Sequence, residues 1–108
     1  MPLDAQIVDS TTGQIDAEFA AHIRVEEHGV LFGHPRFQLG HFPLLSRISD
    51  FYADAECSNA ELEKLIAELE EAASLFGPHN VACPFLGPFH SLCCMAFAKG
   101  KMIAVYAD

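Results

Sequence analysis

Basic residues are scarce in this sequence. Six lysines and arginines stand against fifteen aspartates and glutamates, which gives a formal net charge of −9. Proteins that bind nucleic acids use clustered positive charge to neutralise phosphates, and the sequence has no basic cluster. An anionic membrane surface is disfavoured for the same reason. The charge balance fits a basic partner protein, a cation or a neutral ligand.

Long apolar runs and targeting signals are also lacking. The longest apolar run, residues 92–98, is far too short to span a bilayer. The first nine residues, MPLDAQIVD, contain neither the basic nor the apolar segment of a signal peptide. We therefore expect a soluble cytoplasmic protein. Its four cysteines mostly have apolar neighbours, which is typical of reduced thiols: Cys57, Cys83, Cys93 and Cys94.

The signature motifs of common enzymes are missing. No G-x-G-x-x-G, P-loop or G-x-S-x-G pattern occurs, so nucleotide binding and serine hydrolase chemistry have no support. The C-x-x-C pattern of dithiol redox proteins is absent as well. His90 could activate a neighbouring cysteine, but the order of histidines and cysteines resembles no known Cys–His enzyme. These absences favour a binding protein over an enzyme.

The chain has no internal repeat, linker or low-complexity tract. Of its 108 residues 51% are hydrophobic. A domain of this size buries roughly two thirds of its unfolded surface, so one core can form without disulfides or metal. We expect residues 1–108 to form a single domain without a cofactor.

The first part of the chain predicts a β-hairpin. AQIVD (residues 5–9) fits a short strand that the turn-rich segment STTGQ closes. Residues 18–27, EFAAHIRVEE, alternate between apolar and polar side chains, which is typical of a half-buried strand. EHG then fits a turn, and VLFG (residues 30–33) fits the returning strand.

Two amphipathic helices are expected next. Pro43 suits the first turn of a helix, and apolar residues recur at helical spacing from Leu44 to Ala55. A second helix over residues 58–76 begins with a capping-box pattern, Ser58 and Glu61, and ends at Gly77.

The last third of the chain is compatible with two structures. Residues 88–99 match a helical pattern, but they also fit one arm of a hairpin that turns at Lys99-Gly100, with MIAVYA as the second arm. We favour the hairpin. The predicted fold is α+β, with an antiparallel sheet built from an N-terminal and a C-terminal hairpin and two consecutive amphipathic helices packed on one face.

The acidic residues suggest a binding surface. Residues 58–76 contain five glutamates and one lysine, and some of these glutamates repel each other at helical spacing. We expect a protein-binding module that acts on a basic partner, as inhibitors and immunity-type proteins do when they neutralise a basic enzyme. A solubilising surface would have the same composition. The candidate binding residues are Glu61, Glu68, Glu71, Asp50 and Asp54.

A zinc site or a small enzyme centre in the late loop is the main alternative. Two His–Cys pairs lie close together there, and tetrahedral zinc uses such ligands. The spacing matches no established zinc motif, and cysteines in loops often serve only as small apolar residues. The candidate ligands are His79, Cys83, His90 and Cys93.

The segment GHPRFQLGHF suggests a further alternative, a small-anion site. His34, Arg36 and His41 would surround an anion near the N-terminus of the first predicted helix, where free N–H groups favour negative charge. The simpler interpretation is a connection in which Arg36 pairs with Asp50 or Asp54.

Self-association is expected from the apolar C-terminal hairpin. Both of its predicted arms are apolar on both faces, while two helices cover only one face of a sheet. We therefore predict a two-fold symmetric homodimer, with Met102, Val105 or Phe97 near the contact.

Overall fold

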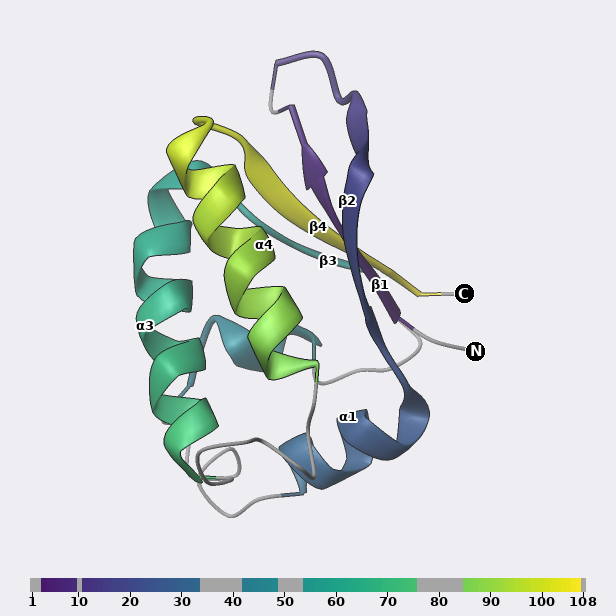
Figure 1. Cartoon of the computed structure of the whole chain (residues 1–108), viewed down its shortest axis with the longest axis vertical. Helices are drawn as coiled ribbons and strands as arrows, with labels where there is room; N and C mark the ends of the chain where they lie inside the picture. Colours follow the sequence, from purple (N-terminus) through teal and green to yellow (C-terminus); the bar gives the residue numbers. More distant parts are fainter. Residues whose placement is uncertain (1–2, 10, 34–41, 49–53, 76–84, 108) are drawn as a thin grey trace.

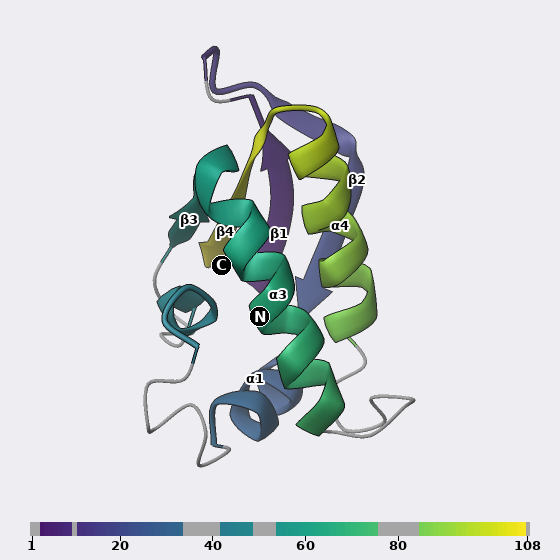
Figure 2. The same cartoon turned by 90° about the vertical axis from the view of Figure 1, so that its left-hand side faces the viewer.

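The computed structural model contains a four-stranded antiparallel sheet that is covered on one face by two helices (Figures 1 and 2). It describes residues 3–9, 11–33, 42–48, 54–75 and 85–107. The strand order is β2-β1-β4-β3, so the first and last strands in sequence are neighbours at the centre of the sheet. The elements are β1 (Leu3–Val8), β2 (Ile15–Ile23), α1 (Val25–Phe32), η1 (Leu45–Ile48), β3 (Ala55–Cys57), α3 (Asn59–Leu75), α4 (Leu86–Ala98) and β4 (Met102–Ala107).

β1 and β2 form the N-terminal hairpin. Leu3 pairs with Ile23 at one end and Val8 with Ile15 at the other, with a break in register after Gln6. Asp9 closes the turn, because its carboxylate accepts hydrogen bonds from the N–H groups of Thr11 and Thr12. These two bonds lower the pKa of Asp9. The turn after Asp9 is thus where the sequence predicted it. It joins two paired strands, β1 and β2, whereas the predicted hairpin paired residues 18–27 with residues 30–33.

The predicted returning strand at residues 30–33 is wrong, because Val25–Phe32 form helix α1. Arg24 lies at the N-cap, and the carboxylate of Glu27 accepts hydrogen bonds from its backbone N–H and its Nε. Acidic side chains in the first turn suit the positive end of the helix dipole. The alternating pattern therefore ends at Ile23, and the following residues bury Leu31 and His28 on one side of a helix.

The predicted helix over residues 43–55 is also wrong in its extent. Among the described residues of this segment, Leu45–Ile48 form one turn of 3-10 helix, η1, and Ala55 already belongs to edge strand β3, opposite Val105 of β4. Residues 49–53 lie outside the described part of the chain. Tertiary hydrogen bonds hold the short turn: His28 Nε2 donates to the carbonyl of Ile48 at 2.8 Å. Such bonds override a helical spacing of apolar residues.

Helix α3 confirms its prediction. The carboxylate of Glu61 accepts hydrogen bonds from the N–H and the hydroxyl of Ser58, at 3.0 and 3.1 Å. The helix is amphipathic as predicted, and its buried apolar residues are Leu62, Leu65, Leu69 and Ala72. The residues beyond Leu75 that were expected to end the helix lie outside the described residues.

Helix α4 replaces the first arm of the predicted C-terminal hairpin, so the hairpin is wrong and the helical alternative is correct. Phe89, Leu92 and Ala96 are buried at helical spacing between α3 and the sheet. Gly100, with φ of +69°, turns the chain into β4, which is the predicted strand. A run that is almost wholly apolar fits either a strand or a helix, and the tertiary contacts that it can make decide which of the two forms.

The fold class is confirmed. The protein is α+β, its sheet is antiparallel, and the consecutive helices α3 and α4 pack together on one face (Figure 2). Alternate residues of β4 divide between the two faces: Ile103 and Val105 join the core, while Met102 and Tyr106 are half-buried on the uncovered face. Within the described ranges, no helix has both the length and the apolar character needed to cross a membrane.

Candidate functional site

The outer surface of α3 is acidic. Glu63, Glu70 and Glu71 are exposed there, and Lys64 is the basic residue of this helix. Glu63 and Glu70 are seven positions apart, about two helical turns, so they lie on the same side. We call Glu63, Glu70 and Glu71 the outer acids of α3.

Glu68 does not belong to this surface, which corrects its predicted position. Its side chain is buried, with 6% of the residue exposed. The carboxylate accepts hydrogen bonds from the N–H of Leu44 at 3.1 Å and of Leu45 at 2.9 Å. Glu68 therefore caps the start of η1 and has a structural role.

Glu61 is only partly exposed and has a basic partner. Arg47 of η1 donates to both of its carboxylate oxygens, at 2.9 and 2.5 Å. The hydrogen bond from Arg47, followed by those from Ser58, lowers the pKa of Glu61 to about 2. The same pairing raises the pKa of Arg47. Of the other predicted binding residues, Asp54 and Glu71 are exposed, and Asp50 lies outside the described residues.

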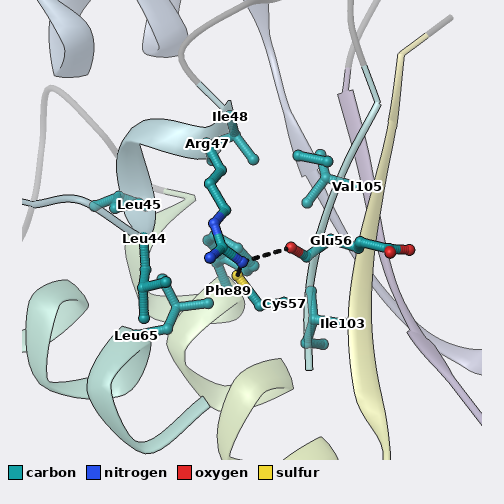
Figure 3. A pocket seen from close by; sticks show the side chains of 11 residues that line it. Leu44, Leu45, Arg47, Ile48, Glu56, Cys57, Leu65, Phe89, Ile103 and Val105 are labelled. Atoms are coloured by element: carbon teal, nitrogen blue, oxygen red, sulfur yellow. Dashed lines mark hydrogen bonds between the residues drawn. The ribbon is translucent and has the colours of Figure 1, made fainter. Parts of the chain in front are cut away.

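A small apolar cavity lies beneath Arg47 (Figure 3). Arg47 also donates to the carbonyl of Glu56 at 3.1 Å and lies 3.9 Å from the sulfur of Cys57. Burial raises the pKa of the Cys57 thiol. The cavity measures about 10 Å³, which is about the space of one water molecule, and apolar cavities stay dry. It is a packing gap rather than a ligand site. Its lining includes Leu44, Ile48, Leu65, Phe89, Ile103 and Val105.

The predicted zinc ligands are not brought together where the chain is described. Cys93 is completely buried in the core, and burial strongly raises the pKa of its thiol. His90 instead faces Glu70 of α3. Across the described ranges, no three His, Cys, Asp or Glu side chains are grouped so that they could hold a metal ion. His79 and Cys83, like the predicted anion ligands His34, Arg36 and His41, lie outside the described residues.

A groove between α3 and α4 is lined by two reactive side chains, and a third lies next to one of them. Its volume is about 310 Å³, and Glu70 and His90 line it together with Leu69, Ala73, Leu86 and Gly87. His90 Nε2 lies 3.2 Å from a carboxylate oxygen of Glu70. His90 Nδ1 lies 3.9 Å from the sulfur of Cys94, which is exposed. We call Glu70, His90 and Cys94 the groove triad.

Sequence reasoning considered His90 as the activator of a neighbouring cysteine but missed this triad. His90 and Cys94 are four residues apart, so a helix brings them together across one turn, whereas a strand would hold them about 13 Å apart on the same face. The preferred strand assignment for residues 88–99 therefore concealed the pair. Glu70 could not be placed beside His90 without the packing of α3 on α4.

No family model, curated protein or solved structure matches this chain. The acidic surface and the groove are thus the two features on which a functional proposal can rest.

Proposed function

We propose that this protein is an acidic protein-binding module whose outer acids of α3 bind a basic partner protein. The observation that supports this proposal is that the glutamates of α3 fall into two groups with different surroundings. The carboxylates of Glu61 and Glu68 bind Arg47 and the backbone of η1, whereas Glu63, Glu70 and Glu71 are exposed, with Glu70 next to His90 of α4.

The local charge favours a basic partner. Arg47, which emerges close to the start of α3, is held in its ion pair with Glu61. The chain as a whole has a net charge of −9, so the outer acids lie within a negative field. Such a field accelerates encounters with a positively charged surface and slows encounters with anions. A basic enzyme that this protein neutralises is the partner class that we propose.

A cytoplasmic location accompanies the proposal. Cys57, Cys93 and Cys94, the cysteines that the structure describes, are all free thiols. Free thiols are typical of a reducing compartment.

Charge reversal tests the binding surface. The variant Glu63→Lys/Glu71→Lys changes two outer acids and leaves Glu68, which the fold needs, untouched. The matched control Glu26→Lys/Glu56→Lys makes the same change in net charge at exposed positions of α1 and β3. Partners captured by the wild-type protein are identified and purified, and their association is followed by stopped-flow at low and physiological salt.

The outer-acid variant should associate more slowly with the basic partner, and the difference should shrink as salt rises. The association rate of the control variant should fall less than that of the outer-acid variant. Equal association rates for the two variants at low salt would contradict the proposal and leave the outer acids as a solubilising surface.

The homodimer stays a proposal, with a changed basis. Val105 lies on the side of β4 that faces the core and is buried there, so it is no longer proposed as a contact residue. Met102, half-buried on the uncovered sheet face, and Phe97, exposed at the end of α4, remain as the proposed contact residues, and Tyr106 lies on the same sheet face as Met102. Sedimentation equilibrium should give about twice the chain mass, whereas 11.8 kDa at micromolar concentration would refute the dimer.

A further inference from the structure

The groove triad joins two helices in one hydrogen-bonded line. Cys94 and His90 lie one turn apart on α4, with 3.9 Å between the sulfur and Nδ1. Glu70 reaches His90 from α3, with 3.2 Å between its carboxylate oxygen and Nε2. The line thus runs from an exposed thiol through an imidazole to a carboxylate.

The carboxylate of Glu70 decides which ring nitrogen of His90 carries the proton. A carboxylate accepts hydrogen bonds and cannot donate them, so Nε2 of His90 has to bear the proton in this contact. In the neutral imidazole the other nitrogen, Nδ1, is then an acceptor that faces the thiol of Cys94. A thiol, a base and a third group that orients the base are the parts of an activated nucleophile.

The contrast with Cys93 shows that this arrangement is specific to Cys94. Cys93 is the preceding residue of the same helix, yet it points into the core, where burial raises the pKa of its thiol. Cys57 is buried as well, and its pKa is also raised. Reactive cysteines are exposed and have a base or a cation beside them, whereas buried cysteines are inert. Among the described cysteines, Cys94 meets this condition.

The groove beside the triad limits the chemistry of the reactant. Leu69, Ala73 and Leu86 offer an apolar wall, and Gly87 leaves open space, because a side chain added there would meet no atom within 4 Å. Glu70 makes this lining negative. A small uncharged or cationic molecule fits this environment, and an anion does not.

We propose that Cys94 is a thiol–disulfide exchange site for neutral or cationic low-molecular-weight disulfides, with His90 as its base and Glu70 as a positioning residue. This site does not depend on the proposed protein-binding function, although Glu70 belongs to both surfaces.

The exchange is balanced without any further reactant. The thiol proton of Cys94 passes to His90 Nδ1, and the sulfur attacks one sulfur atom of the disulfide. A bond forms between these two sulfurs while the original S–S bond breaks. The departing sulfur leaves as a thiolate and takes the proton from His90. Cys94 is thereby oxidised to a mixed disulfide, and the departing half is reduced to a thiol.

The reaction rate at Cys94 tests the assignment. The full-length protein is incubated with cystamine, which is cationic, with hydroxyethyl disulfide, which is neutral, or with dithiodiglycolate, which is anionic. Peptide mapping by mass spectrometry assigns each adduct to a cysteine, and Cys94→Ser identifies the signal of Cys94. Cystamine should react fastest and dithiodiglycolate slowest.

Replacing the base should slow the exchange. In His90→Gln the rate at Cys94 with cystamine at pH 7 should fall about tenfold or more, because proton transfer by a side chain typically contributes at least this much. The difference from wild type should almost vanish near pH ~10, where an ordinary thiol ionises without a base. A merely structural role of His90 would leave this pH dependence unchanged.

The positioning role of Glu70 is tested against its neighbour. Glu70→Gln should slow the exchange severalfold at pH 7, whereas Glu71→Gln, which removes the same charge, should have a smaller effect. Equal rates at Cys94 for wild type and His90→Gln at pH 7, or a preference for the anionic disulfide, would overturn the proposal. Thermal unfolding shows that each variant is folded, and Glu70→Gln remains as a second test if His90→Gln is not.

Discussion

On the inner side of α3 a glutamate holds backbone N–H groups of another element, whereas on its outer side glutamates of the same helix face solvent. Glu68 accepts hydrogen bonds from Leu44 and Leu45 and is almost completely buried. Glu71, three residues later, is exposed. The comparison shows that charge alone does not identify a binding surface, because the position of each residue around the helix decides what its charge does.

The largest expected effect is at the inner position. Glu68→Ala leaves two buried N–H groups without their acceptor, and each such loss costs about 1–3 kcal/mol. We expect the free energy of unfolding, measured with urea, to fall by about 3 kcal/mol. Glu71→Ala is the matched control and should change it by less than about 0.5 kcal/mol. Similar losses in both variants would remove the distinction between the two sides of α3.

Glu27 extends the comparison to α1, with a smaller effect. This buried carboxylate accepts the N–H of Phe85 at 2.9 Å, at the start of α4, and also binds Arg24. Glu27→Ala should lower the free energy of unfolding by about 1–2 kcal/mol, as the loss of a helix cap does. The control Glu26→Ala changes the exposed neighbouring residue and should alter the free energy of unfolding very little. A stable Glu27→Ala variant would show that α4 does not need this cap.

The pair of Glu61 and Arg47 predicts a pH dependence. Because the pKa of Glu61 is lowered from 4.5 to about 2, its contribution to stability is complete above pH 4.5 and is lost as the pH falls towards 2. We expect Glu61→Gln to flatten the acid side of the stability curve in this window, followed by thermal unfolding at several pH values. Glu63→Gln, on the outer side, should keep the wild-type slope.

The smallest effect on stability is expected for the outer acids. Glu63→Lys/Glu71→Lys should change the free energy of unfolding by less than about 0.5 kcal/mol, since both residues are exposed. Urea unfolding with an unchanged m-value checks this. A large loss of stability would mean that the outer acids belong to the fold and that the binding test above cannot use them.

Helix α3 could be predicted from the sequence because its capping residues and its apolar spacing agree. The segments that failed are those in which local patterns conflict with tertiary contacts. Residues 30–33 are apolar enough for a strand, but Glu27 starts a helix before them by binding Arg24. Residues 92–98 are apolar throughout, so the partners of α4 rather than the sequence period set its structure.

The candidate site was only partly predictable for the same reason. The spacing of α3 does contain a clue to the burial of Glu68, which lies three residues after Leu65 and four before Ala72, both buried. The groove triad has no such clue. Its geometry needs both the helical state of α4, which places Cys94 beside His90, and the contact of α4 with α3, which brings Glu70 to His90.

The pairing of the first strand with the last has a consequence for synthesis on the ribosome. Leu3 of β1 pairs with Ala107 of β4, and β4 alone joins β3 to the rest of the sheet. Contacts so distant in sequence form slowly, because almost the whole chain has to be closed into a loop first. A nascent chain can form the β1–β2 hairpin and the helices early, but β1 keeps an unpaired edge until β4 has left the exit tunnel. An exposed strand edge pairs readily with other chains, so this interval is when the protein is most exposed to aggregation and most dependent on chaperones.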